Sequence, residues 1–119
     1  MSEKLRVGIL GLSHDHVWSN VQTLMARDDA EVVGAADPHA ELRRKFNSEF
    51  EVDAHADAAT LLDEGNLDAV YIFSSNAEGA SLAVAAADRG LHILIEKPMA
   101  ASLAQADAML AAARRQNVR

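Results

Sequence analysis

The sequence predicts an α/β fold with a doubly wound parallel sheet. Five short apolar runs alternate with five stretches of helical spacing along the 119 residues. Strands separated by helices of this kind run parallel, with right-handed crossovers and helices on both faces of the sheet. The chain shows neither an internal repeat nor a linker. We therefore expect one domain with five strands in the order 3-2-1-4-5.

The first two strand and helix pairs occupy the N-terminal part. The apolar run 5–11 ends at a glycine and is followed by apolar residues at helical spacing over 17–25. A second run, 31–37, ends in Asp37-Pro38. This pair predicts a helix start, because Asp is a good cap and Pro suits the first helical position. The helix is expected to reach about Phe50.

The alternation continues to the end of the sequence. The remaining strands are predicted over 51–54, 67–73 and 91–95. The helices that follow them are predicted over 57–64, from a cap at Asn76 to about Gly90, and from Ser102 to about Gln116. Ser102 and Gln105 have the spacing of a capping box, which predicts that the last helix opens there.

Composition excludes several classes of protein. The chain has 18 acidic and 11 basic residues, a net charge of −7, and no cysteine. An acidic balance argues against nucleic-acid binding, which depends on clustered cations. The lack of cysteine excludes a disulfide framework, a thiolate nucleophile and a cysteine-based zinc site. The first apolar stretch is too short for a signal peptide or a membrane span. We expect a cytoplasmic protein without a membrane partner.

The predicted fold itself nominates a ligand crevice. In open α/β sheets, ligands bind outside the carboxyl ends of the strands where the strand order reverses, here between strands one and four. The segments expected around this crevice are Gly11 to His16, Asp37, Ser74 to Asn76, and Glu96-Lys97-Pro98.

The turn after the first strand has one feature of a dinucleotide-binding loop. Such loops carry Gly-x-Gly-x-x-Gly, and this turn keeps only the first glycine, Gly11. Ser13 is small enough to approximate the second glycine, whereas His16 cannot copy the close packing of the third. Asp15 also places a negative charge where a pyrophosphate would meet the helix N-terminus. Taken alone, this turn is compatible with a dinucleotide site and with an ordinary connection between a strand and a helix.

Asp37 has two compatible interpretations. It lies 26 residues after Gly11, somewhat more than the spacing of about 20 that is usual for a carboxylate on the adenosine ribose. It is also a natural helix cap. If it binds the ribose, NAD is favoured over NADP, because a carboxylate repels a 2′-phosphate. The cations at 43–45 are interpreted as a solvated helix face.

His14 and His16, with Asp15 between them, also suggest a metal chelate. Residues two apart on a helix do not share a face, and the positive end of the helix dipole disfavours a cation. We therefore predict no metal at this turn.

Glu96-Lys97-Pro98 is the least ordinary motif. Two charges that end an apolar strand, followed by proline, are hard to explain by packing alone. A lysine at this edge of the sheet could bond a substrate hydroxyl or carbonyl and have a shifted pKa. The alternative is an ordinary ion pair of Lys97 and Glu96 on a loop.

Four segments together resemble the N-terminal domain of the Gfo/Idh/MocA oxidoreductases: 6–11, 32–37, 67–72 and, above all, 90–100 with its Glu-Lys-Pro element. The resemblance implies a Rossmann domain that holds NAD(P). In full-length members this domain is joined to a C-terminal domain built on an open antiparallel sheet. It further implies hydride exchange between the nicotinamide and a hydroxyl-bearing carbon of a sugar, inositol or related compound.

The resemblance also implies roles for individual residues. The cofactor would contact Gly11, Leu12, Ser13, His14, Asp15, Asp37, Ser74, Ser75, Asn76, Glu96 and Lys97. Lys97 would be the catalytic residue, polarising the reacting hydroxyl or exchanging a proton with it. The peptide bond before Pro98 would be cis, as in some relatives. NAD is expected as the cofactor in preference to NADP.

The chain departs from the family pattern in four ways. Ser13 and His16 replace glycines, Ser75 replaces a usual proline, Gly79 stands where many members have histidine, and the sequence stops at Arg119, where relatives continue into a substrate domain. Residues 1–119 are therefore expected to be a cofactor-binding domain that is inactive alone. A stand-alone nucleotide-binding or interaction module and an empty structural scaffold are the alternatives. We also expect an exposed apolar edge at 92–95 to favour a homodimer or other self-association.

Overall fold

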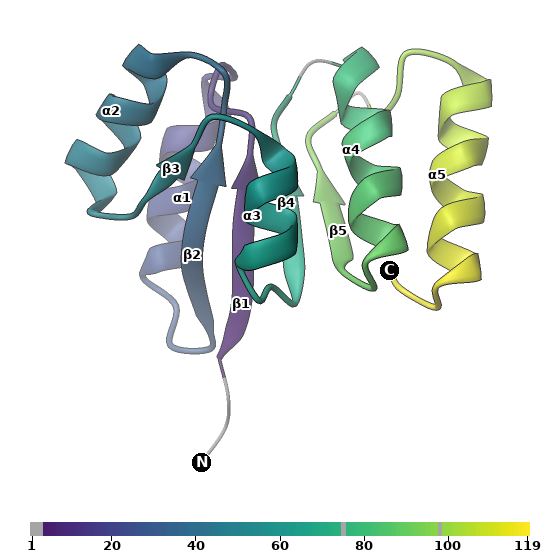
Figure 1. Cartoon of the computed structure of the whole chain (residues 1–119), viewed down its shortest axis with the longest axis horizontal. Helices are drawn as coiled ribbons and strands as arrows, with labels where there is room; N and C mark the ends of the chain where they lie inside the picture. Colours follow the sequence, from purple (N-terminus) through teal and green to yellow (C-terminus); the bar gives the residue numbers. More distant parts are fainter. Residues whose placement is uncertain (1–3, 75, 98) are drawn as a thin grey trace.

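The computed structural model describes residues 4–74, 76–97 and 99–119, and over these residues it has a five-stranded sheet (Figure 1). Its strands are β1 (Leu5–Leu10), β2 (Ala30–Ala36), β3 (Ala54–His55), β4 (Ala69–Ile72) and β5 (His92–Ile95). Its helices are α1 (His16–Met25), α2 (Ala40–Phe50), α3 (Ala58–Glu64), α4 (Asn76–Asp88) and α5 (Leu103–Arg115). The strand order is β3-β2-β1-β4-β5, and every pair is parallel. The predicted fold class and strand order are confirmed.

Helices cover both faces of the sheet because successive strand side chains point to opposite sides. On one face, Val17 of α1 and Phe46 of α2 pack in a cluster with Ile9 of β1. On the other face, Leu61 of α3 and Ala83 of α4 pack with residues such as Leu10 and Ile72. The alanines of α4 let that helix lie close to the sheet, while α5 lies outside α4 at the yellow end of the chain (Figure 1).

Helix α2 begins later than predicted. It starts at Ala40, with His39 in the N-cap position, so the prediction that Asp37-Pro38 opens this helix is wrong. The Asp37 carboxylate faces the interior instead, where it accepts hydrogen bonds from the backbone of its own turn and of the β1–α1 turn. Arg43, expected in a solvated face, donates from its guanidinium to the Asp37 carbonyl at 2.9 Å.

The third strand is displaced along the chain. It occupies Ala54–His55, whereas Glu51, the first residue of the predicted strand, is the C-cap of α2 in a left-handed conformation (φ 57°). The N-cap predicted at Ser102 is confirmed: its Oγ accepts a hydrogen bond from the Gln105 N–H at 3.2 Å. The reciprocal bond is shifted by one residue, since the Gln105 side chain accepts from Ala101.

The outer edge of β5 is only partly free. The Ile93 N–H donates to the carbonyl of Arg119 at 2.6 Å, and the Arg119 N–H donates to Nδ1 of His92. The Leu94 side chain stays 58% exposed, beside a hollow of about 580 Å³ that Tyr71 and Leu24 also line. The apolar surface expected at this strand is therefore present, although its backbone edge is partly occupied.

Replacing Leu94 by Lys is expected to reduce any self-association of the chain, because it places a charge on this apolar surface. Sedimentation velocity over a range of concentrations measures the effect. Leu103→Lys is the matched control, since Leu103 is 84% exposed but lies on α5, away from the hollow. Equal concentration dependence in wild type and both variants would show that the β5 surface does not mediate association.

Candidate functional site

The β1–α1 turn requires glycine at its first position. Gly11 has φ +91°, a left-handed conformation that side chains disfavour. A Cβ atom there would lie 2.7 Å from the backbone nitrogen of Ser74 and 2.9 Å from its Cα. The Gly11 N–H also donates to the carbonyl of Ala36 at 2.8 Å. The carboxyl ends of β1, β2 and β4 therefore meet at Gly11.

Asp37 fixes this turn from the neighbouring strand. The residue is only 4% exposed, yet its carboxylate has hydrogen-bond partners. Oδ2 accepts from the Leu12 N–H at 2.8 Å, and Oδ1 accepts from the His39 N–H and contacts His39 Nδ1, both also at 2.8 Å. A buried charge is tolerated when such bonds replace its hydration. Asp37 thus joins the end of β2 to the β1–α1 turn.

A cleft of about 170 Å³ opens where these turns meet. Four predicted site residues line it: Gly11, Ser13, Asp37 and Ser74. The sequence interpretation did not assign the other residues that line it, which are Leu10, Ala36, Pro38, His39, Ala56, Ala58, Glu78 and Leu82. Several of these residues follow β2, β3 or β4. They could have been predicted from the rule that ligands bind at the carboxyl ends of strands.

The remaining residues of the first and fourth turns have different positions. The Leu12 side chain is buried in the core, and only its N–H faces the site. Asp15 is exposed in the N-cap position of α1. Ser74 Oγ donates to the Leu10 carbonyl at 3.3 Å, and α4 begins at Asn76. Ser75 and Pro98, with the predicted cis peptide, lie outside the described residues.

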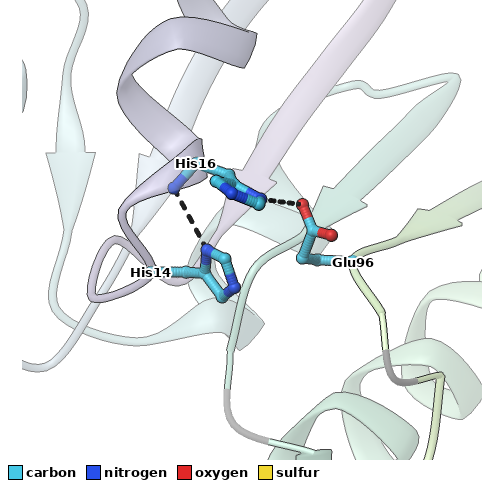
Figure 2. A group of neighbouring side chains, drawn as sticks. All are labelled: His14, His16 and Glu96. Carbon is cyan, nitrogen blue, oxygen red and sulfur yellow. Dashed lines mark hydrogen bonds and ion pairs between the residues drawn. The ribbon is translucent and has the colours of Figure 1, made fainter.

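His14, His16 and Glu96 form a cluster at the far side of the same turn (Figure 2). His16 Nδ1 lies 3.3 Å from Glu96 Oε2, and His14 Nδ1 accepts from the His16 N–H at 3.1 Å. The two imidazole rings are 4.6 Å apart. The expectation that they point apart on a helix is wrong, because His14 precedes α1 and helical spacing does not apply to it.

Glu96 and Lys97 follow β5 and differ in exposure. The Glu96 side chain is 13% exposed, whereas Lys97 is exposed. Partial burial acts to raise the pKa of Glu96, but hydrogen bonds from the Lys97 N–H and from His16 lower it overall. The contact of Lys97 with Glu96 is made by the backbone N–H of Lys97, which donates to Glu96 Oε1 at 3.1 Å. The pKa of nearby Tyr71 is raised by burial and by the negative charge of Glu96.

The site therefore has two ends joined by the β1–α1 turn. One end is the cleft with Asp37, and the other is the group of His16, Glu96 and Lys97 beyond the N-terminus of α1. A helix N-terminus presents backbone N–H groups and a positive dipole to an anion. The arrangement suits an elongated ligand that has polar groups at both ends and an anionic centre.

The fold and this crevice define a dinucleotide-binding domain of the doubly wound α/β class. Residues 5–119 match the oxidoreductase family Gfo/Idh/MocA, NAD-binding Rossmann fold. The chain belongs to this family, and the resemblance found in its motifs is confirmed. Within the described part of the chain, no helix has the length and apolar character needed to cross a membrane.

Characterised relatives are similar over nearly the whole chain. A dTDP-3,4-didehydro-2,6-dideoxy-alpha-D-glucose 3-reductase from Streptomyces antibioticus is 31% identical over 95% of this chain and 34% of its own length. A 3-ketoreductase from Actinomadura kijaniata, solved with TDP-benzene and NADP, is 26% identical (TM-score 0.88; 98% of this chain, 37% of that one).

The structural likeness extends to a protein of lower identity. The WlbA dehydrogenase from Bordetella pertussis, solved with NADH and UDP-GlcNAcA, has a TM-score of 0.93 at 24% identity. The match covers 98% of this chain and 36% of the WlbA chain. At this identity the similarity supports the fold alone. The chain spans about a third of the length of the relatives it matches.

Proposed function

We propose that this chain is the cofactor-binding part of an oxidoreductase that exchanges hydride between a nicotinamide dinucleotide and a hydroxyl-bearing carbon. Sugars, inositols and related compounds are the proposed substrate class. Membership of the family supports the cofactor, and the relatives that act on nucleotide-linked sugars support the substrate class. Because the chain spans about a third of such relatives, we propose that it does not turn over substrate alone.

The observation that carries this proposal is the close approach at Gly11. A Cβ atom at this position would overlap the Ser74 backbone, so the turn holds two strand ends together beside an open cleft. A dinucleotide needs such a turn because its pyrophosphate must approach the backbone closely. The substituted positions Ser13 and His16 do not close the cleft, since Ser13 lines it and His16 lies at the other end of the turn, against Glu96.

Different residues of the crevice would contact different parts of the proposed cofactor. Asp37 and His39 would hold the adenosine ribose in the cleft, where Asp37 Oδ2 keeps acceptor capacity beyond its one bond to Leu12. The backbone from Ser13 to Asp15 would face the pyrophosphate at the N-terminus of α1. Glu96 and Lys97 would lie at the nicotinamide end.

When bound, the nicotinamide ring accepts or donates the hydride. The proposed role of Lys97 is to take the proton that the substrate hydroxyl releases on oxidation, and to return it on reduction. Its exposed side chain is free to reach a substrate, because its contact with Glu96 is made by the backbone N–H. Glu96 then positions this segment against His16 of the first turn.

NAD is the proposed cofactor in preference to NADP. The Asp37 carboxylate and Glu78 both line the cleft, and a 2′-phosphate on the adenosine ribose would meet this negative charge. Arg43 is a nearby cation whose guanidinium already bonds the Asp37 carbonyl, and the His39 ring contacts the Asp37 carboxylate. The relatives include structures with NADH and with NADP. Family membership therefore does not decide between the two cofactors, and the proposed preference for NAD rests on these residues of the cleft.

Calorimetric titration of the 119-residue chain with NADH and with NADPH tests the proposal. We expect saturable binding of NADH and weaker binding of NADPH, because the carboxylates of the cleft repel the added phosphate. Equal affinity for both would refute the ribose role of Asp37. Absence of binding at millimolar concentrations of either would refute the cofactor site in this chain.

A further inference from the structure

Beyond the nucleotide site, we propose that His14, His16 and Glu96 bind a divalent transition metal, with Zn²⁺ as the best match. The cluster joins the β1–α1 turn to the segment after β5, positions 80 residues apart in the sequence. One potential ligand atom from each residue lies within 4.8 Å of the other two (Figure 2). The family assignment does not call for a metal at this position.

The geometry is close to that of a zinc site. Zinc binds histidine nitrogen and carboxylate oxygen at about 2.0–2.2 Å in tetrahedral sites, which sets neighbouring ligand atoms about 3.3–3.5 Å apart. The separation of His16 Nδ1 and Glu96 Oε2 is 3.3 Å, so this pair already has that spacing. The third ligand atom, on the His14 ring, lies within 4.8 Å of the other two, so a rotation of this half-buried loop side chain would bring it to that spacing.

The donor set selects the class of metal. Two imidazoles and one carboxylate suit zinc and its transition-metal neighbours, whereas Mg²⁺ and Ca²⁺ prefer oxygen ligands. Three protein ligands leave a coordination position for water or for an oxygen atom of a molecule in the crevice. This is the arrangement of an open metal site, in contrast to a structural site closed by four ligands.

The surroundings orient the ligands. The Lys97 N–H donates to Glu96 Oε1, which holds the carboxylate with Oε2 toward His16. Outer hydrogen bonds of this kind fix ligand orientation in metal sites. His14 Nδ1 accepts a hydrogen bond from the His16 N–H. A metal bound at Nδ1 would replace this bond directly. A metal bound at Nε2 would move the ring proton to Nδ1, which could then no longer accept the bond.

An ion pair alone is the simplest alternative. It accounts for His16 and Glu96, and the second imidazole ring, 4.6 Å from the first, is held by the bond that its Nδ1 accepts from the His16 N–H, so the Zn²⁺ titration has to distinguish the two interpretations. The N-terminal dipole of α1 opposes a cation. The Glu96 carboxylate, the exposed Asp15 and the net charge of −7 act in the other direction.

Zinc titration of the nucleotide-free chain tests the site. We expect one ion to bind per chain, and Co²⁺ to give the visible absorption of a four-coordinate complex. His16→Ala and Glu96→Gln are each expected to lower the Zn²⁺ affinity by roughly tenfold or more, since even outer-shell changes cost about that much. His55→Ala is the matched control, a histidine outside the cluster, and should leave the affinity unchanged.

Two results would overturn the assignment. One is wild-type binding that does not saturate, and the other is equal Zn²⁺ affinity in wild type and His16→Ala. Glu96→Gln keeps the side-chain shape, and far-UV circular dichroism of both variants establishes that lost binding is not lost folding. Because the titration contains no nucleotide, its outcome is independent of whether NADH binds.

Discussion

Replacing Gly11 by Ala is expected to destabilise the domain by about 2–4 kcal/mol and to abolish dinucleotide binding. Part of the cost is conformational, because Gly11 has φ +91°. The rest is steric, since the new Cβ would lie within 3 Å of the Ser74 backbone, which cannot rotate away as a side chain can. Relief of this overlap must separate β1 from the loop after β4, and that separation would deform the cleft.

Gly90→Ala separates these two contributions. Gly90 also has a left-handed conformation (φ +75°), but a Cβ there would have no atom within 4 Å. Its substitution is therefore expected to cost about 1–2 kcal/mol and to leave NADH binding intact. Urea unfolding of both variants measures the free energies. Equal losses for Gly11→Ala and Gly90→Ala would contradict the close approach at Gly11.

Replacing Asp37 by Ala is expected to cost about 2–4 kcal/mol of folding free energy. The substitution removes the acceptor for the Leu12 N–H and the His39 N–H, and the former is buried. Asp37→Asn keeps one oxygen acceptor and is expected to lose less. The exposed carboxylate of Asp63, which pairs with Arg89, provides a control whose removal should change stability little.

The same variants separate the structural role of Asp37 from its proposed ligand role. Titrations under conditions where all proteins are folded should show weaker NADH binding by Asp37→Asn and a smaller preference over NADPH. The change in preference is the diagnostic result, because a purely structural loss would weaken both cofactors alike. An unchanged ratio of the two affinities would leave Asp37 only its role in tying β2 to the turn.

The fold could be predicted because it depends on signals that are local in the sequence. Alternating apolar and helical stretches fix a parallel sheet, and the Ser102 cap marks the start of α5 within one residue. The start of α2 could not be predicted in the same way. Asp37 and Pro38 have the local chemistry of a helix start. The Asp37 carboxylate instead accepts a hydrogen bond from the N–H of Leu12, which is distant in sequence, and so fixes the β1–α1 turn.

The site was predicted less completely, for a related reason. Gly11, Ser13, Asp37 and Ser74 follow strands and were found by the rule for strand ends. His14, His16 and Glu96 were predicted to lie around one crevice, but not to form a cluster, because both histidines were treated as helical and Asp15 was the only carboxylate considered beside them. Contacts between distant segments depend on strand order and on loop geometry together, and only the first of these is readable from the pattern.

We propose that a nicotinamide dinucleotide occupies the crevice around Gly11. Amide chemical-shift mapping by NMR during titration of the ¹⁵N-labelled chain with NADH tests it most directly. We predict the largest shifts at Gly11, Ser13, Asp37 and Ser74, with little change at Ala112 of α5. Saturable shifts confined to α5 or to the hollow beside Leu94, with none at Gly11 and Ser13, would contradict the claim.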